Sequence, residues 1–326
     1  MIRVALLRCA SPANKFGGIQ KHCIDLHNLM CDSREVFILP IKNIPNFCIP
    51  FVQKRVYNWR ALYRYLKESN CNIVHIHGFA TLDIIQSIII ANILRKKIVY
   101  SPHYHPFQYL RHPLLGKIYF FCCLRFLLRY VASIVTIANN DTAFFTRFHK
   151  HVYRIPHPFN DGKNILRKIE KKRNMILFIG RNENNKGLFH LYQLDAKYEV
   201  HLVTNGNVNR KDFIIHSNIS GEELERLYKQ ASLVVIPSRY EAFSYVALEA
   251  FANGTPVVMS NTVMIADYLK GVRGFSSFNF GDESSFLKAV DKTIGTTVDT
   301  EKILSIFSKS QVKKLYEEVY LNAINQ

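Results

Sequence analysis

Residues 233–258 constrain the fold of this chain most, because they predict a complete βαβ unit. Residues 233–236 (L-V-V-I) form a short, β-branched apolar run typical of a buried parallel strand. A helix is expected from Ser244 to Asn253, where Gly254 suits a left-handed C′ position, and a strand follows at residues 257–259. Ligands of open parallel sheets bind at the carboxyl ends of the strands, so the loop after residue 236 is a candidate binding site.

Two carboxylates lie in this unit, Glu241 in the loop and Glu249 in the helix. The first-turn amides of the helix, around Phe243, Ser244 and Tyr245, are donors at the positive end of the helix dipole. Two acids beside an anion-binding helix start suit a ligand with both hydroxyls and phosphate. The alternative is structural: Glu241 caps the helix and Glu249 is a solvated surface residue.

The run P-S-R-Y-E-A-F-S-Y-V-A-L-E-A-F-A-N-G-T-P-V-V resembles the Glu-x7-Glu motif of glycosyltransferase family 4, a family of GT-B glycosyltransferases. The family form reads P-S-x-x-E-G-F-G-x-x-x-x-E-A-x-A-x-G-x-P-V-V. Ala242 and Ser244 stand where the family has glycines that bring the backbone close to the donor phosphates. The resemblance implies a retaining enzyme in which Glu241 holds sugar hydroxyls, Glu249 holds the ribose, and residues 242–245 lie at the donor phosphates.

A second loop in the same half carries two cations. Residues 175–179 predict a strand, and G-R-N-E-N-N-K-G follows at residues 180–187. Arg181 and Lys186 can converge on a diphosphate, the first as a planar fork and the second as a point charge. A solvated loop is the alternative. The family has G-R-x-x-x-x-K-G here and uses both cations on the donor pyrophosphate, which implies catalytic roles for Arg181 and Lys186.

The first half carries glycines and histidines after its predicted strands. Gly17 and Gly18 follow the strand at residues 2–7, either as a simple turn or, as the family implies, as a loop that contacts donor or acceptor. A histidine after the strand at residues 97–101 lies against the donor sugar in the family. His103 is its match, and His105 is a second candidate; a histidine that only packs at the strand end is the alternative.

No metal and no other cofactor is expected. Two His-x-His pairs, at residues 75–77 and 103–105, follow neighbouring strands, but neither a carboxylate nor a cysteine completes a site with ligand spacing. The sequence also contains no D-x-D, the metal-binding motif of the other large glycosyltransferase fold.

Charge is distributed unevenly along the chain. Residues 1–160 hold 21 lysines and arginines against 6 acids, whereas residues 161–326 hold 22 against 19. A strongly basic half predicts a polyanionic partner, such as a phosphate-bearing substrate or an anionic membrane. Nucleic acid is not expected, because no known binding module is recognisable.

Residues 111–138 alternate long apolar runs with Arg111, Lys117, Arg125 and Arg129. We expect an amphipathic helix that lies in the membrane interface and faces the acceptor. The alternative is a core helix whose basic side chains reach out to solvent.

The seven cysteines lie between Cys9 and Cys123 without C-x-x-C spacing, which indicates reduced thiols and a cytoplasmic protein.

The expected fold is therefore α/β, of GT-B type, with two Rossmann-like domains that face each other across a cleft. We expect an acceptor- and membrane-facing domain at residues 1–157, a nucleotide-sugar donor domain at residues 158–309, and a C-terminal helix at 310–326 that packs back on the first domain. The expected function is sugar transfer from a nucleotide-sugar to a lipid-linked glycan in surface polysaccharide synthesis. We expect the protein to be peripheral on the inner face of the membrane. A GT-B nucleotide-sugar 2-epimerase and a non-catalytic sugar-nucleotide- or membrane-binding subunit remain alternatives.

Overall fold

The chain forms two compact units, each built on its own parallel sheet. The computed structural model describes residues 1–8, 18–31, 36–40, 46–49, 54–79, 81–104, 118–159, 170–206, 208–241 and 243–326. The first unit comprises Met1–Pro158 and Lys309–Gln326, and the second comprises Phe159–Ser308. The predicted boundaries, after residues 157 and 309, lie next to these divisions.

The sheet of the first unit is entirely parallel and has the order β2-β1-β5-β6-β7-β8. Its strands alternate with helices along the chain, as βαβ folds require. Their bounds are β1 (Ile2–Arg8), β2 (Val36–Pro40), β5 (Ile73–His77), β6 (Lys97–Ser101), β7 (Ser133–Thr136) and β8 (Val152–Arg154).

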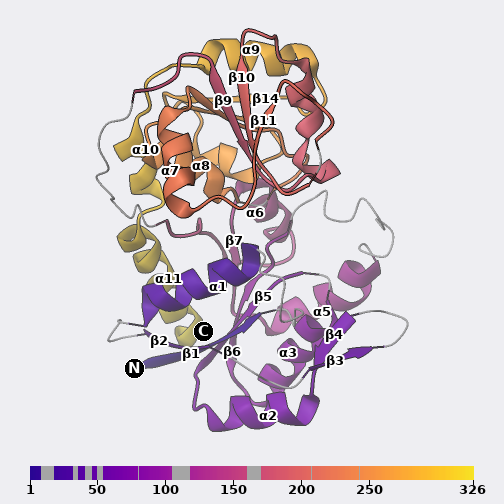
Figure 1. Ribbon diagram of the computed structural model, residues 1–326. Helices are drawn as coiled ribbons and strands as arrows, with labels where there is room; N and C mark the ends of the chain where they lie inside the picture. The colour runs from indigo at the N-terminus through magenta and orange to yellow at the C-terminus, as the bar shows by residue number, and fades with distance from the viewer. Residues whose placement is uncertain are drawn as a thin grey trace. The chain divides into compact units, whose positions relative to one another are not determined.

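Helices cover both faces of this sheet, so apolar side chains of β1 are buried on either side. Ala5 and Leu7 join one core, and Val4 and Leu6 join the other, because successive residues of a strand point to opposite faces. The helices of the unit are α1 (Gly18–Met30), α2 (Trp59–Glu68), α3 (Leu82–Ile93), α5 (Arg125–Leu127), α6 (Asn139–Phe145) and α11 (Lys309–Asn325) (Figure 1).

Helix α11 packs on the first unit although its sequence comes last. A stripe at helical spacing, formed by Val312, Tyr316, Val319, Tyr320 and Ala323, is buried in the same core as Val4 and Leu6. The yellow end of the chain in Figure 1 accordingly lies beside the indigo helix α1.

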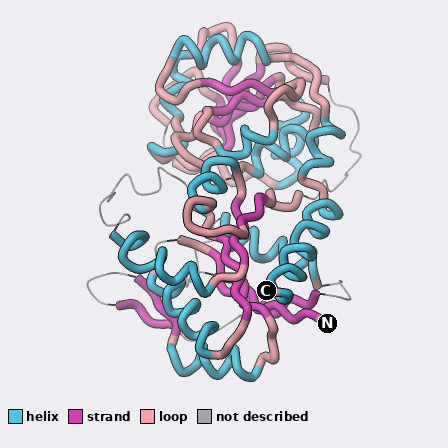
Figure 2. Tube along the Cα trace, turned by 180° about the vertical axis from the view of Figure 1, so that it is seen from behind, coloured by secondary structure: helices cyan, strands magenta, loops and turns pink. Residues whose placement is uncertain are grey.

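The second unit repeats the architecture, with its strands surrounded by helices (Figure 2). Its strand order is β11-β10-β9-β12-β13-β14, again all parallel. The βαβ unit predicted from the sequence is present as β12, α8 and β13, and Gly254 has the expected left-handed φ of 66°. The strands are β9 (Met175–Ile179), β10 (Glu199–Val203), β11 (Ile214–His216), β12 (Leu233–Ile236), β13 (Val257–Ser260) and β14 (Phe275–Phe278), and the helices are α7 (Gly221–Gln230), α8 (Tyr245–Ala252), α9 (Glu283–Thr293) and α10 (Thr300–Ile306).

Two local elements complete the description. In the first unit, β3 (Asn46–Ile49) pairs antiparallel with β4 (Lys54–Tyr57). These four-residue strands pair only with each other and lack the long apolar pattern that marks the sheet strands. In the second unit, a short 3₁₀-helix, Leu188–Gln193, follows the loop after β9, and Leu194 beyond it returns to an extended conformation.

Candidate active site

The loops that follow β9 and β12 pack directly against each other. Gly187 has a φ of 67°, and a Cβ at this position would lie 1.8 Å from the carbonyl oxygen of Pro237. The backbone N–H of Arg239 donates to the carbonyl of Asn185 over 2.7 Å. Because β9 and β12 are adjacent parallel strands, the basic loop and the acidic loop meet at one edge of the sheet.

Lys186 and Glu241 form an ion pair between these two loops. The Lys186 Nζ lies 3.2 Å from the Glu241 Oε2, and the two side chains are 22% and 18% exposed. The hydroxyl of Ser238 donates to the same carboxylate oxygen over 3.0 Å. Sequence reasoning did not single out Ser238; the Pro-Ser dipeptide in the motif was the available signal.

Arg181 does not converge with Lys186 in this structure. Its guanidinium pairs with Glu183 at 2.8 Å, and its side chain is 74% exposed. An exposed ion pair of this kind contributes little free energy, so Arg181 can leave Glu183 for a stronger anion at small cost.

The start of helix α8 is buried. Ser244 occupies the N-cap position, is fully buried, and its Oγ has no hydrogen-bond partner among the described residues. Phe243 is also buried, and its ring contacts that of Tyr245. Ala242 lies outside the described residues. A buried hydroxyl without a partner costs free energy, which a ligand at this helix start could recover.

Glu249 is held by a tyrosine of the neighbouring helix α7. The hydroxyl of Tyr228 donates to the Glu249 Oε2 over 2.7 Å. Burial raises the pKa of Tyr228 well above its usual value, and the negative charge of Glu249 adds to this shift. Glu249 is therefore not a simple solvated surface residue. Tyr228 could not be singled out from the sequence, because it lies in a different helix from the Glu-x7-Glu stretch.

In the first unit, His103 follows β6 and is nearly buried. Its φ is 47°, and its Nε2 lies 3.1 Å from the Nδ1 of His77, the last residue of β5. Burial lowers the pKa of His103 to about 4, so the ring is neutral at physiological pH. Gly18 is the first residue of α1, whereas Gly17 and His105 lie outside the described residues.

Residues 118–130 are helical, but not as one regular helix. A π-helical stretch, Tyr119–Leu124, is followed by α5 and by a 3₁₀ turn, Leu128–Tyr130. The segment buries Phe120, Leu124 and Leu128 in the core, and Arg125 and Arg129 are exposed beside exposed apolar side chains, which are Ile118, Phe121, Phe126 and Tyr130. Arg111 and Lys117 lie outside the described residues.

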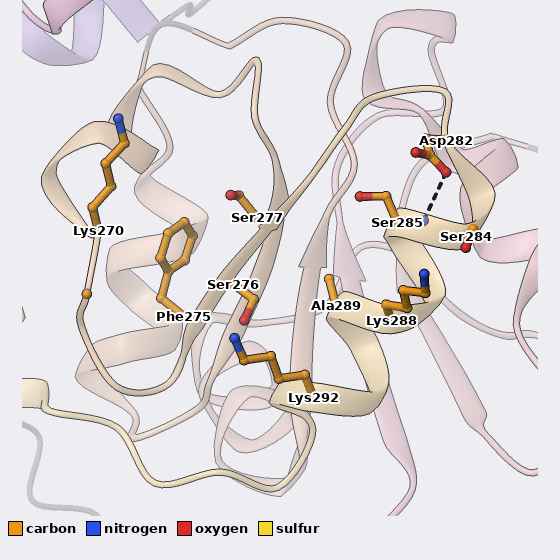
Figure 3. A pocket seen from close by; sticks show the side chains of 11 residues that line it. Lys270, Phe275, Ser276, Ser277, Asp282, Ser284, Ser285, Lys288, Ala289 and Lys292 are labelled. Atoms are coloured by element: carbon orange, nitrogen blue, oxygen red, sulfur yellow. Dashed lines mark hydrogen bonds between the residues drawn. The ribbon is translucent and has the colours of Figure 1, made fainter.

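The structure also contains a hollow in the second unit that was not predicted. It has a volume of about 590 Å³ and lies between β14 and α9 (Figure 3). Asp282 caps α9 there by accepting from the N–H of Ser285 over 2.9 Å. Lys270, Lys288 and Lys292 line it, but none of the predicted donor residues does, so it has no part in the site built by Lys186 and Glu241.

Among the residues that the structure describes, no helix combines the length and the apolar character needed to cross a bilayer.

The two units, each an α/β layer structure on a parallel sheet, define the fold class as GT-B. Residues 163–296 match the family model described as glycosyl transferases group 1. The lipopolysaccharide outer core galactosyltransferase WaaB, in its apo form, superimposes with a TM-score of 0.71 at 15% identity, and the alignment covers 98% of this chain and 99% of that one. The chain therefore has the GT-B fold, and most of its second unit matches a family model of glycosyl transferases.

Two relatives define the similarity at the level of sequence. An uncharacterized glycosyltransferase, MJ1607, from Methanocaldococcus jannaschii is 34% identical over 120 residues, a stretch that spans only 31% of either protein. An uncharacterized 41.2 kDa protein in the cps region of Klebsiella pneumoniae is 22% identical over 294 residues, which cover 81% of this chain and 78% of that protein.

Proposed function

We propose that the chain is a retaining glycosyltransferase that moves a sugar from a nucleotide-sugar to a lipid-linked glycan in surface polysaccharide synthesis. The observation that carries the proposal is the Lys186–Glu241 pair, which joins the basic and acidic loops at the carboxyl edge of the second sheet. Both residues belong to motifs that resemble those of glycosyltransferase family 4.

The roles divide between the leaving group and the sugar. Lys186, Arg181 and the first amides of α8 stabilise the diphosphate as its negative charge develops, which is usually the largest catalytic contribution. Glu241 accepts hydrogen bonds from sugar hydroxyls, and Glu249 accepts them from the ribose. Ser238 and Tyr228 donate to these two carboxylates and hold them in place.

The transfer is a front-face displacement. The bond from the anomeric carbon to the phosphate oxygen breaks, the bond to the acceptor oxygen forms on the same face, and the acceptor proton passes to the leaving phosphate. His103 contacts the sugar and orients it. Its neutral ring can donate one hydrogen bond and accept another.

We propose that this transfer needs no metal. Lys186 and Arg181 supply the positive charge that a divalent ion supplies elsewhere, and the sequence has no D-x-D to hold such an ion at the diphosphate.

The acceptor part of the proposal rests on the first unit. Arg125, Arg129 and the exposed apolar side chains of residues 118–130 fit a surface that docks on anionic lipid. The Klebsiella relative is named for a cps region, and one of the structural neighbours is a lipopolysaccharide galactosyltransferase. Together these support a peripheral enzyme on the cytoplasmic face of the membrane.

The test is transfer by the purified chain from a panel of nucleotide-sugars to a lipid-pyrophosphate-linked sugar, with and without added Mg²⁺ or Mn²⁺. We expect a glycosylated lipid that retains the anomeric configuration, and equal rates in both buffers. Conversion of the nucleotide-sugar to its 2-epimer would identify an epimerase, binding without turnover would identify a non-catalytic subunit, and a rate that needs the added ion would refute the metal-free mechanism.

A further inference from the structure

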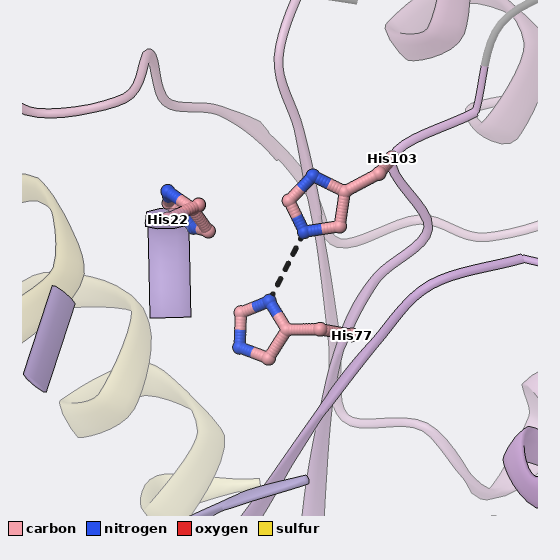
Figure 4. A group of neighbouring side chains, drawn as sticks. All are labelled: His22, His77 and His103. Carbon is pink, nitrogen blue, oxygen red and sulfur yellow. Dashed lines mark hydrogen bonds between the residues drawn. The ribbon is translucent and has the colours of Figure 1, made fainter. Parts of the chain in front are cut away.

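The first unit contains a group of buried histidines that the proposed transfer does not explain. His22 from α1, His77 from the end of β5 and His103 after β6 each offer a ring nitrogen, and these nitrogens all lie within 4.8 Å of one another (Figure 4). The three residues come from separate elements, so the fold and not local sequence brings them together. Sequence reasoning missed His22, because it stands on the apolar face of α1, one turn before the buried Leu26.

All three rings are shielded from solvent and neutral. Their exposed fractions are 1% for His22, 0% for His77 and 7% for His103. Burial lowers the pKa of each ring below its usual value, and for His22 and His77 the neighbouring histidines add to the shift. A neutral imidazole has one nitrogen lone pair, which is the form that binds a metal ion.

Within the part of the chain that the structure describes, His22 has one ring nitrogen with a hydrogen-bond partner and one without. Its Nε2 lies 3.3 Å from the hydroxyl of Tyr316 on α11, and its buried Nδ1 has no hydrogen-bond partner among the described residues. Ligand histidines use their second nitrogen for such a contact, which fixes the ring and its tautomer. A buried nitrogen without a partner calls for an explanation, and an ion is one.

His77 and His103 have a matching separation. Their Nδ1 and Nε2 atoms are 3.1 Å apart. A tetrahedral Zn²⁺ with Zn–N bonds of about 2.0–2.1 Å holds two ligand nitrogens about 3.3 Å apart. His103 also has a φ of 47°, a conformation that usually needs support from its surroundings.

We propose that His22, His77 and His103 bind one borderline divalent metal ion of the Zn²⁺ class. Three imidazoles and no carboxylate suit such an ion better than Mg²⁺ or Ca²⁺, which prefer oxygen ligands. The proton now shared between His77 and His103 moves to the other nitrogen of its own ring, so the three ligands remain neutral.

The inference does not depend on the proposed transfer. The ion would link α1, β5 and the segment after β6 within the first unit. It would occupy the Nε2 of His103 and leave the Nδ1 of that ring for a sugar. It is not a bridge to the leaving diphosphate.

The test is direct metal binding by the full chain. The protein is stripped with a chelator, titrated with Zn²⁺, desalted and analysed for zinc; Co²⁺ serves as a second, visible probe. We expect about one ion per chain, an absorption spectrum of tetrahedral Co²⁺, and a melting temperature that rises to a plateau with added Zn²⁺.

Variants separate this site from zinc held by other histidines. His22→Gln and His103→Gln should lose the ion and the rise in melting temperature. The matched control is His75→Gln: His75 is equally buried in β5, but Tyr320 and Ser101 occupy both of its nitrogens. His201→Gln, in the second unit, is a control that leaves the first unit intact. The proposal is overturned if the wild-type chain retains no zinc, or if His22→Gln and His103→Gln retain as much as the controls.

Discussion

The ammonium group of Lys186 lies 3.2 Å from the carboxylate of Glu241, which joins two loops that the sequence separates by more than fifty residues. The two opposite charges stabilise each other, and both side chains are largely shielded from solvent. When a nucleotide-sugar binds, we expect Lys186 to pair with its diphosphate and Glu241 to accept hydrogen bonds from the hydroxyls of its sugar. In the proposed function, the pair thus holds in place one group for the anionic part of the ligand and one for its hydroxylated part.

Lys186→Met should lower kcat/KM by about two orders of magnitude, because it removes a charge that stabilises the leaving diphosphate. Arg181→Ala should have an effect of similar size. Folding should be nearly unchanged, since Lys186 is partly exposed and Arg181 is largely exposed. Steady-state kinetics and a thermal melt measure the two properties.

Lys197→Met is the control for these variants, because Lys197 is an exposed lysine of the same unit that lies 3.7 Å from Asp291. It should turn over as the wild type does. Near-normal turnover of Lys186→Met would show that this lysine does not act on the diphosphate.

Glu249→Gln should weaken the binding of the free nucleoside diphosphate, whereas Glu241→Gln should lower turnover more than affinity. Tyr228→Phe should weaken nucleotide binding less than Glu249→Gln, roughly threefold to tenfold, because it removes one hydrogen bond that orients Glu249. Calorimetric titration of the nucleotide into each variant measures this. Equal losses of affinity in Glu241→Gln and Glu249→Gln would contradict the separate roles.

The second unit could be predicted closely from the sequence, and the reason is physical. Strand, loop and helix follow one another in the Glu-x7-Glu stretch, so local pattern alone determines where Glu241 and Glu249 stand along the unit. The hydrogen-bond partners of these acids could not be predicted. The contact of Ser238 with Glu241 depends on the conformation of the loop, and Tyr228 comes from another helix.

The first unit was less predictable, because its buried polar groups meet through long-range packing. His22 and Tyr316 are nearly three hundred residues apart and come together only because α11 returns to the first sheet.

In the second unit, the position of Lys186 relative to Arg181 was also missed. A five-residue spacing allows the two cations to converge, but Arg181 pairs with Glu183 instead.

Asp141 should make stability depend on pH. It is fully buried at the start of α6, and burial raises the pKa of its carboxyl to about 6, although the N–H groups of Ile137 and Ala138 donate to it. The folded protein then holds this proton more tightly than the unfolded chain, so stability is lost as pH rises through about 6.

Between about pH 4.5 and 7 this loss should amount to roughly 2 kcal/mol of the free energy of unfolding. Urea denaturation of the wild type and of Asp141→Asn at both pH values isolates it, because asparagine does not titrate. The same pH dependence in both proteins would mean that Asp141 is ionised throughout this range.

The first unit should bind anionic membranes through residues 111–130. Each basic side chain near such a surface contributes about 1 kcal/mol, so removal of four should reduce partitioning on the order of a thousandfold if their effects add. Binding should weaken with salt without vanishing, because exposed Phe121 and Phe126 insert as well. The variant replaces Arg111, Lys117, Arg125 and Arg129 by Gln. Sedimentation with anionic liposomes measures the fraction of each protein that is bound to the membrane.

A control variant with the same loss of charge replaces four exposed basic residues elsewhere in the unit, which are Arg60, Arg64, Lys67 and Arg95. It should sediment with the liposomes nearly as the wild type does. If both variants lose binding equally, net charge and not this segment holds the protein on the membrane.

Hydrogen–deuterium exchange with and without the nucleotide-sugar tests most directly where the donor binds. Amides of residues 181–187 and 238–250 should exchange more slowly in the complex, because the ligand contacts both loops and the start of α8. The same experiment on Lys186→Met should show little protection at matched ligand concentration. Unchanged exchange in both loops, with protection instead around the hollow lined by Lys270, Lys288 and Lys292, would contradict the donor site proposed at Lys186 and Glu241.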